Sequence, residues 1–236
     1  MLSFLFPPIC PLCAKELLDK GEHICKSCSK EQIFIKEPTC YSCGKPMKNH
    51  EKEYCSDCRQ HPKNFERGMG LCIYQKPVTN SLAAIKYKNE RKFAKYYLEE
   101  IQKRKYRDLL QLKIDVIIPV PIHRKKRRKR GFNQAEIFAN GIAEMLNKPM
   151  YTKIVERIHD TKPQKQLNPG ERKSNLKKAF RGNLKEYQRA GMPKRVLLVD
   201  DIYTTGSTAE AVTVALKQLG IREVYVFCIA IGKGFS

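Results

Sequence analysis

The sequence VLLVDDIYTTGST, residues 196–208, decides the fold. Its leading apolar residues predict a buried strand, Val196–Val199, that ends at two adjacent carboxylates. A short loop of hydroxyl residues with one glycine then leads into a helical pattern. In a parallel α/β sheet, ligands bind beyond the carboxyl ends of the strands, where the next helix offers unpaired N–H groups. The stretch therefore predicts a phosphate-binding loop beside a carboxylate pair that suits a sugar.

The polar residues of this stretch suit the two ends of a 5-phosphorylated ribose. Asp200 and Asp201 would repel phosphate but accept hydrogen bonds from vicinal ribose hydroxyls. Gly206 can adopt a positive φ, which lets the backbone approach a phosphate closely. Further hydroxyl donors come from Thr204, Thr205, Ser207 and Thr208.

Two other interpretations of this stretch compete with a ribose-phosphate site. An apolar strand that ends in Asp is also typical of P-loop NTPases, but the sequence contains no G-x-x-x-x-G-K-[ST] motif to hold a triphosphate. In a simpler interpretation, the carboxylates only end the strand and a hydroxyl residue caps the helix. We favour the ligand site because six polar positions and a glycine coincide after one buried strand.

The charge of the chain is large and unevenly distributed. The net charge is +22 over 236 residues. Residues 1–66 carry 10 Lys or Arg against 9 Asp or Glu, and residues 67–236 carry 36 against 15. Such a surplus attracts polyanions, namely nucleic acid, diphosphate groups or an anionic membrane surface. No apolar run approaches the roughly 20 residues of a membrane span, and the apolar start lacks a positive leader, so we expect a soluble cytoplasmic protein.

Eight of the ten cysteines form four C-x-x-C pairs separated by intervals of 11 residues. Two such pairs supply four thiolates to a tetrahedral metal ion, so four pairs predict two structural zinc sites in a module of residues 1–66. Disulfides and a redox centre are the competing explanations. Sequential pairing needs the least chain, and both interleaved pairing and one degenerate site stay open. The predicted ligands are Cys10, Cys13, Cys25, Cys28, Cys40, Cys43, Cys55 and Cys58.

Residues 67–236 alternate between strand and helix patterns. Cys72 and Cys228 lie in apolar strand contexts, which predicts that they pack in the core. The chain closes with a predicted helix, Ala209–Leu219, that Gly220 ends in a left-handed conformation. The expected strands are Val196–Val199 and, in addition, Gly70–Tyr74, Asp115–Ile122 and Glu223–Ile231, with helical periodicity from Val78 to Ile101 and from Gln134 to Met145.

Seven consecutive cations, Arg124–Arg130, follow the predicted strand Asp115–Ile122. A solvated basic loop is the ordinary interpretation, yet crowded cations repel one another unless a polyanion joins them. We therefore expect this loop to bind an anion beside the carboxylate pair. A polar, basic segment, residues 157–180, is long enough to act as a lid. The candidates for contacts with nucleic acid or diphosphate are Lys86, Arg124, Arg127, Arg128 and Arg130.

The chain resembles the ComF family of competence proteins over nearly its whole length, although Arg124–Arg130 is more densely basic than is typical of that family. The resemblance is carried by the four cysteine pairs, Pro-Val-Pro at 119–121, Arg-Gly-Phe-Asn-Gln at 130–134, Gln166-Leu167, Arg172, Asn175, Ala179-Phe180 and the loop of 196–208. It implies a double zinc-ribbon module before a type I phosphoribosyltransferase-like parallel sheet with flanking helices. Residues 196–208 resemble the PRPP-binding loop of such enzymes, in which Asp200 and Asp201 would hold the ribose hydroxyls and Thr204–Thr208 the 5-phosphate.

The family also implies a role in natural transformation, where DNA enters the cytoplasm as a single strand. Its expected partners are single-stranded DNA, PRPP, the competence helicase and recombination proteins. The alternative is an active phosphoribosyltransferase in nucleotide salvage or modification, with magnesium bridging diphosphate and ribose. Asp200 and Asp201 would then be the catalytic residues, because carboxylates stabilise positive charge that develops on the ribose. The sequence offers no identifiable acceptor site.

Overall fold

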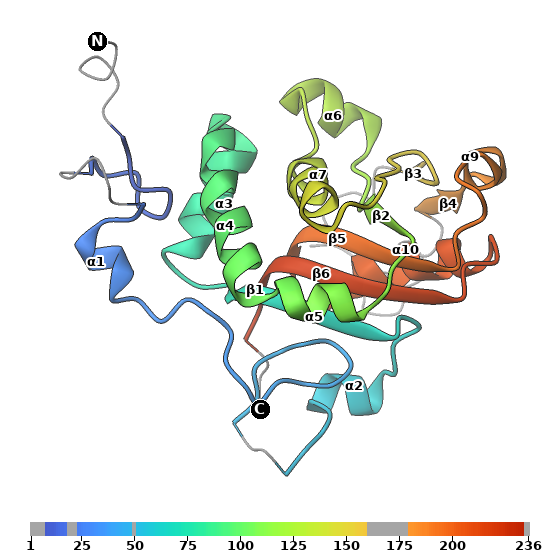
Figure 1. Ribbon diagram of the computed structural model, residues 1–236, viewed down its shortest axis with the longest axis horizontal. Coiled ribbons are helices and arrows are strands. Elements are labelled where there is room, and N and C mark those ends of the chain that lie inside the picture. Colours follow the sequence, from blue (N-terminus) through green and yellow to red (C-terminus); the bar gives the residue numbers. More distant parts are fainter. Residues whose placement is uncertain (1–7, 18–22, 49–50, 160–178, 234–236) are drawn as a thin grey trace.

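A four-stranded parallel sheet forms the centre of the molecule (Figure 1). The computed structural model describes residues 8–17, 23–48, 51–159 and 179–233. The strands β5 and β6 are apolar along most of their length, as expected of strands that are covered on both faces. The strand order is β1 (Arg67–Ile73), β6 (Glu223–Ile231), β5 (Arg195–Tyr203) and β2 (Val116–Pro119).

Alternate residues of β5 point to two hydrophobic clusters, one on each face of the sheet. Leu197 and Val199 belong to the cluster that includes side chains of α3, α4 and α7. Val196 and Leu198 belong to the cluster that includes side chains of α10. The predicted parallel sheet with flanking helices is therefore confirmed. These helices span Val78–Lys88 (α3), Ala94–Arg104 (α4), Gln134–Leu146 (α7) and Ser207–Lys217 (α10).

Shorter elements surround this sheet. The strands β3 (Val155–Arg157) and β4 (Phe180–Gly182) pair antiparallel. The predicted lid, including Gln166, Arg172 and Asn175, lies outside the described residues. No helix within the described ranges is long and apolar enough to cross a bilayer. The other elements are α1 (Lys26–Ser29), α2 (Ser56–Gln60), η1 (Arg91–Phe93), α5 (Tyr106–Gln111), α6 (Arg124–Arg130) and α9 (Leu184–Arg189).

The two cysteine groups pack on opposite faces of the sheet. Cys10 and Cys28 belong to the cluster of α3, α4 and α7, whereas Cys40 and Cys43 belong to the cluster of α10. The chain between the groups runs antiparallel to β1, where the Ile35 amide donates to the Leu71 carbonyl at 3.0 Å and the Ile73 amide donates to the Ile33 carbonyl at 2.7 Å. This polar N-terminal sequence therefore shares both cores of the sheet instead of building its own.

The bounds of β1, β2 and α10 differ from the sequence prediction by one to three residues at each end, and two differences are larger. The strand β5 does not end at Val199 but continues through both carboxylates to Tyr203, because Asp200 and Ile202 still pair with Cys228 and Ala230 of β6. The basic run forms the helix α6 and not a loop. The His123 Nδ1 atom accepts from the Lys125 amide at 3.3 Å at the start of this helix, and Gly131 ends it with a φ of 81°.

Other predictions of local structure are confirmed. Cys72 and Cys228 are buried in strands, and Gly220 has a positive φ of 99° after α10. The helix after the basic run begins at Gln134, and its cap residue Asn133 is tied to the end of β2. The Asn133 Nδ2 atom donates to the Val120 carbonyl at 2.9 Å. This bond holds the turn between α6 and α7 at the carboxyl end of the sheet.

Candidate functional site

The carboxyl ends of β2 and β5 lie side by side and open into a cleft. Pro119, the last residue of β2, pairs with Val199, and the Val120 amide donates to the Val199 carbonyl at 2.8 Å. The connection after β2 therefore begins next to Asp200. The cleft has a volume of about 650 Å³. Its polar and aromatic lining comprises Lys86, Tyr87, Asn89, Lys126, Lys129, Arg130, Phe132, Gln134, Arg157, Asp200, Asp201 and Thr208.

The two carboxylates of β5 form the acidic part of this cleft. Asp201 is buried, and its Oδ2 atom lies 3.7 Å from the Nζ atom of Lys86 in α3 without a hydrogen-bond partner. The Asp201 amide donates to the Asp200 Oδ1 atom at 2.9 Å. Burial, together with the charge of Asp201, raises the pKa of Asp200 well above its usual range. Such a pair gains from hydroxyl donors or nearby cations.

The hydroxyl residues after β5 form a turn into α10. Thr205 is exposed, and its Oγ1 atom lies 2.8 Å from the Ser207 Oγ atom. Gly206 has a φ of 76°, and a Cβ atom there would overlap the Tyr203 hydroxyl, so glycine is required for both reasons. Besides Asp200, the turn residues Thr204, Thr205, Gly206, Ser207 and Thr208 line a small cavity of about 40 Å³ that adjoins the cleft.

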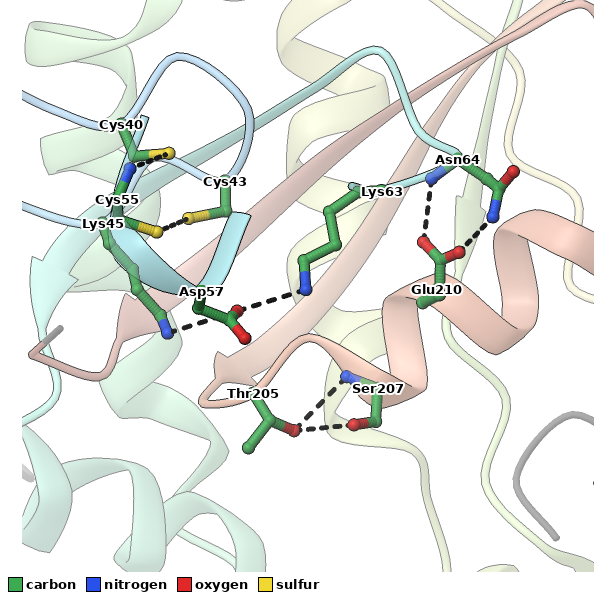
Figure 2. A network of polar contacts seen from close by, with 10 residues as sticks. All are labelled: Cys40, Cys43, Lys45, Cys55, Asp57, Lys63, Asn64, Thr205, Ser207 and Glu210. Carbon is green, nitrogen blue, oxygen red and sulfur yellow. Dashed lines mark hydrogen bonds and ion pairs between the residues drawn. The ribbon is translucent and has the colours of Figure 1, made fainter. Parts of the chain in front are cut away.

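The segment that follows the second cysteine group, Cys40, Cys43, Cys55 and Cys58, is bonded to α10, the helix that follows this turn (Figure 2). The Lys63 Nζ atom lies 3.1 Å from the Asp57 carboxylate, within the knuckle of Cys55 and Cys58. The next residue, Asn64, donates its amide to the Glu210 carboxylate in the first turn of α10 at 3.0 Å.

The Tyr203 ring adds a contact in the core. It packs edge-on against Phe65, with ring centroids 6.4 Å apart. Burial raises the pKa of Tyr203, and the thiolates of Cys43 and Cys58 raise it further. Tyr203, which precedes the turn, therefore packs in the same hydrophobic cluster as the second cysteine group.

The position of each of the seven cations around the axis of α6 decides which cavity it lines. Lys129 and Arg130 lie about one turn after Lys126, and all three residues line the cleft. Arg124 and Arg127 line a second cavity of about 360 Å³ instead, where Arg127 binds the Glu136 carboxylate at 2.5 and 3.1 Å.

Of the predicted anion-binding residues, Lys86 and Arg130 therefore lie with Asp200 and Asp201, whereas Arg124 and Arg127 do not. Arg128 lines neither cavity.

The candidates named from the sequence do not include Lys126, Lys129, Arg157 or Tyr87 of the cleft, although Lys126 and Lys129 belong to the basic run that was expected to bind an anion. A prediction of a helix over 124–130 would have placed Lys126 and Lys129 on the same side as Arg130 or next to it, because positions three and four apart share a face. No local signal identifies Arg157, since it comes from β3, which the sequence pattern does not predict.

The eight paired cysteines form two groups, which decides between sequential and interleaved pairing. Cys10, Cys13, Cys25 and Cys28 form one, and Cys40, Cys43, Cys55 and Cys58 form the other, with the sulfur atoms of each group within 4.8 Å of one another. The Sγ atoms of Cys13 and Cys25 lie 3.6 Å apart, and those of Cys43 and Cys55 3.7 Å apart. Zn–S bonds of about 2.3 Å in a tetrahedron place sulfur atoms about 3.8 Å apart. Both groups therefore fit structural zinc.

Comparison with known proteins shows which proteins this chain is similar to. A family model described as Double zinc ribbon domain matches residues 1–59. Competence protein F of Haemophilus influenzae is 37% identical over 121 residues, which are 51% of this chain and 52% of that protein. The DNA utilization protein YhgH of Salmonella typhimurium is 32% identical over 136 residues, which are 58% and 57% of the two chains. Competence protein ComFC of Bacillus subtilis is 29% identical over 105 residues, which are 44% and 39%.

A solved purine phosphoribosyltransferase from Pyrococcus horikoshii Ot3 is 25% identical, with a TM-score of 0.35 over 57% of this chain and 72% of that chain. The fold and the cysteine groups define a double zinc-ribbon protein with a parallel α/β sheet. The chain is a homologue of the proteins named competence protein F, ComFC and YhgH, so the resemblance to the ComF family is confirmed. It spans about half the length of the first two of these relatives.

The metal groups generate the first prediction. We expect two zinc ions per chain, one for each group. The variants Cys10→Ser/Cys13→Ser and Cys40→Ser/Cys43→Ser should each keep one ion and unfold at a temperature lower by several °C, because metal binding contributes folding free energy. Elemental analysis and thermal unfolding measure both effects. Cys72→Ser is the control, since this buried thiol lies outside both groups, and loss of zinc from it would contradict the assignment.

The raised pKa of Asp200 generates the second prediction. The folded chain keeps the Asp200 proton to higher pH than the unfolded chain, so stability falls as pH rises from about 3.9 towards the raised pKa. Asp200→Asn cannot ionise, and its unfolding temperature should exceed that of the wild type increasingly as the pH rises above about 4. Asp108→Asn, on the exposed surface of α5, is the control. A pH-independent difference at Asp200 would contradict the raised pKa.

Proposed function

We propose that this chain is a cytoplasmic protein of natural transformation that binds single-stranded DNA and a PRPP-like ribose-phosphate ligand. In this proposal, residues 1–66 form the zinc-binding module and residues 67–236 the phosphoribosyltransferase-like domain. One observation carries it: the carboxylates Asp200 and Asp201, the hydroxyl turn and the cations of α6 meet at one end of the sheet.

Each part of a ribose-phosphate ligand has a complement in this cleft. Asp200 and Asp201 would accept hydrogen bonds from the ribose hydroxyls, and magnesium would bridge those hydroxyls and the diphosphate. The turn of Thr204–Thr208 would bind the 5-phosphate through hydroxyls and the amides at the start of α10. Lys86, Lys126, Lys129 and Arg130 would neutralise the diphosphate, which the acidic pair would otherwise repel.

The DNA part of the proposal rests on charge and on the relatives. Their names refer to competence and to DNA utilization. The helix α6 presents seven cations without a buried residue, which suits the phosphates of a flexible single strand. The competence helicase and recombination proteins are the proposed protein partners, because they would handle the same strand.

A second candidate function is transfer of ribose 5-phosphate from PRPP to an acceptor. The carboxylate pair favours it, since the half-buried Asp200 and the buried Asp201 would stabilise positive charge on the ribose when ionised. Lys126, Lys129 and Arg130 would stabilise the diphosphate that leaves. Release of diphosphate on incubation with PRPP, magnesium and a panel of bases tests this candidate.

The ribose-phosphate site generates the third prediction. PRPP with magnesium should raise the unfolding temperature of the wild type, because a ligand at 100 times its Kd stabilises the folded state by about 2.7 kcal/mol. The double variant Asp200→Ala/Asp201→Ala should show no shift. Asp108→Ala, with its exposed side chain on α5, should shift as the wild type does. An equal shift in the double variant would contradict the role of the carboxylates.

The cations of α6 generate the fourth prediction. Binding of an oligothymidylate should weaken with salt, with a log–log slope of about 0.7 per neutralised phosphate. Changing Lys126, Lys129 and Arg130 to Gln should reduce that slope by about 2. A control with the same charge changes Lys95, Lys103 and Arg107 to Gln, exposed residues of α4 and α5 that do not line the cleft. The same slope in both triple variants would show that α6 does not contact the strand.

A further inference from the structure

The cleft contains an exposed aromatic side chain that has no evident role in binding a ribose or a phosphate. Tyr87, the penultimate residue of α3, lines the cleft together with Asp200 and Asp201. Its side chain is 74% exposed, more than any other large apolar or aromatic side chain in the described ranges. It belongs to neither hydrophobic cluster of the sheet. The ring therefore contributes little packing to the fold and is available to a ligand.

Two cations of the cleft lie near the Tyr87 ring. The Arg130 guanidinium is 5.6 Å and the Lys86 Nζ atom 5.8 Å from the ring centroid. These distances fall within the range of a cation–π contact, which is worth only about 0.5–1 kcal/mol at an exposed site. The Lys86 Nζ atom also lies 3.7 Å from the Asp201 carboxylate, so Lys86 links the Tyr87 ring to the carboxylate pair.

The second aromatic residue of the cleft is not available in the same way. Phe132 is 8% exposed, and the Arg91 guanidinium lies 4.2 Å from its ring centroid. Its ring is therefore covered by protein. Of these two aromatic residues, Tyr87 alone offers a ring that a ligand can reach.

The three kinds of side chain in the cleft correspond to the three parts of a nucleotide. Carboxylates suit ribose hydroxyls, and cations suit phosphates. An exposed aromatic ring suits the π-face of a base, and stacking of this kind is tolerant of base identity. A ribose phosphate without a base would leave the ring unused. The volume of about 650 Å³ lies within the range of small-molecule sites and leaves room for a base beside the sugar.

We propose that Tyr87 is the stacking platform for a nucleobase placed next to the ribose in this cleft. The inference rests on the proposed ribose-phosphate site and adds the class of group bound beside it. The base belongs either to a nucleotide of a DNA strand or to a free nucleotide or base. Both sources present the same aromatic chemistry, and the ligands of the test separate them.

The test compares ligands that differ only in the base. Adenosine 5′-monophosphate is paired with ribose 5-phosphate, and a 12-nucleotide oligothymidylate is paired with an abasic strand of equal length. The wild type should prefer the base-bearing member of at least one pair. Tyr87→Ala should reduce affinity for that member by about 5- to 150-fold and leave ribose 5-phosphate binding unchanged, whereas Tyr87→Phe should keep the preference. A defect confined to the oligonucleotide assigns a DNA strand, and one confined to the monophosphate assigns a free nucleotide.

The control and the contrary outcomes separate this inference from the site on which it rests. Tyr41→Ala removes a 60% exposed tyrosine that does not line the cleft and should bind every ligand as the wild type does. The wild type could bind ribose 5-phosphate without a preference for a base, or Tyr87→Ala could keep that preference. Either result would show that Tyr87 is not a stacking platform for a base. If the wild type does not bind ribose 5-phosphate, the proposed site itself is wrong.

Discussion

Two adjacent carboxylates near the carboxyl end of the central strand β5, Asp200 and Asp201, constrain the charges around them. Removing an ionised carboxylate from water costs several kcal/mol unless cations or hydrogen-bond donors compensate for it. Lys86 reaches Asp201 from α3, and the pKa of Asp200 is raised by burial and by its neighbour. Further cations from α6 line the same cleft. The cleft therefore suits a ligand that brings both hydroxyls and phosphates.

The cysteine groups matter to this cleft through packing. Each lies on one face of the sheet, so the N-terminal sequence is joined to both cores. The second group adjoins the turn at Gly206 through Tyr203, and it adjoins α10 through the bond between Asn64 and Glu210 (Figure 2). The second cysteine group thus packs near the turn of Thr204–Thr208 without lining the cleft.

Much of the site could be predicted because its residues are neighbours in the sequence. The run of 196–208 contains both carboxylates, the hydroxyl residues and the glycine, and its local pattern indicated a strand, a turn and a helix. The basic run was misread as a loop because seven like charges disfavour an isolated helix. His123 and Gly131 nevertheless cap it as one, and Asn133 ties the turn that follows it to β2. Tyr87 and Arg157 come from distant segments and carried no local signal.

The sequence by itself determined the chemistry of this protein. The spacing of the cysteines defined tetrahedral metal groups, and the order of residues 196–208 defined a carboxylate pair followed by a turn of hydroxyl residues with one glycine. Only the tertiary structure decided which cations face the carboxylates, which cysteine group packs near the turn and which aromatic ring enters the cleft. The physical reason is that these choices depend on helix phase and strand order, which bring together residues far apart in the chain.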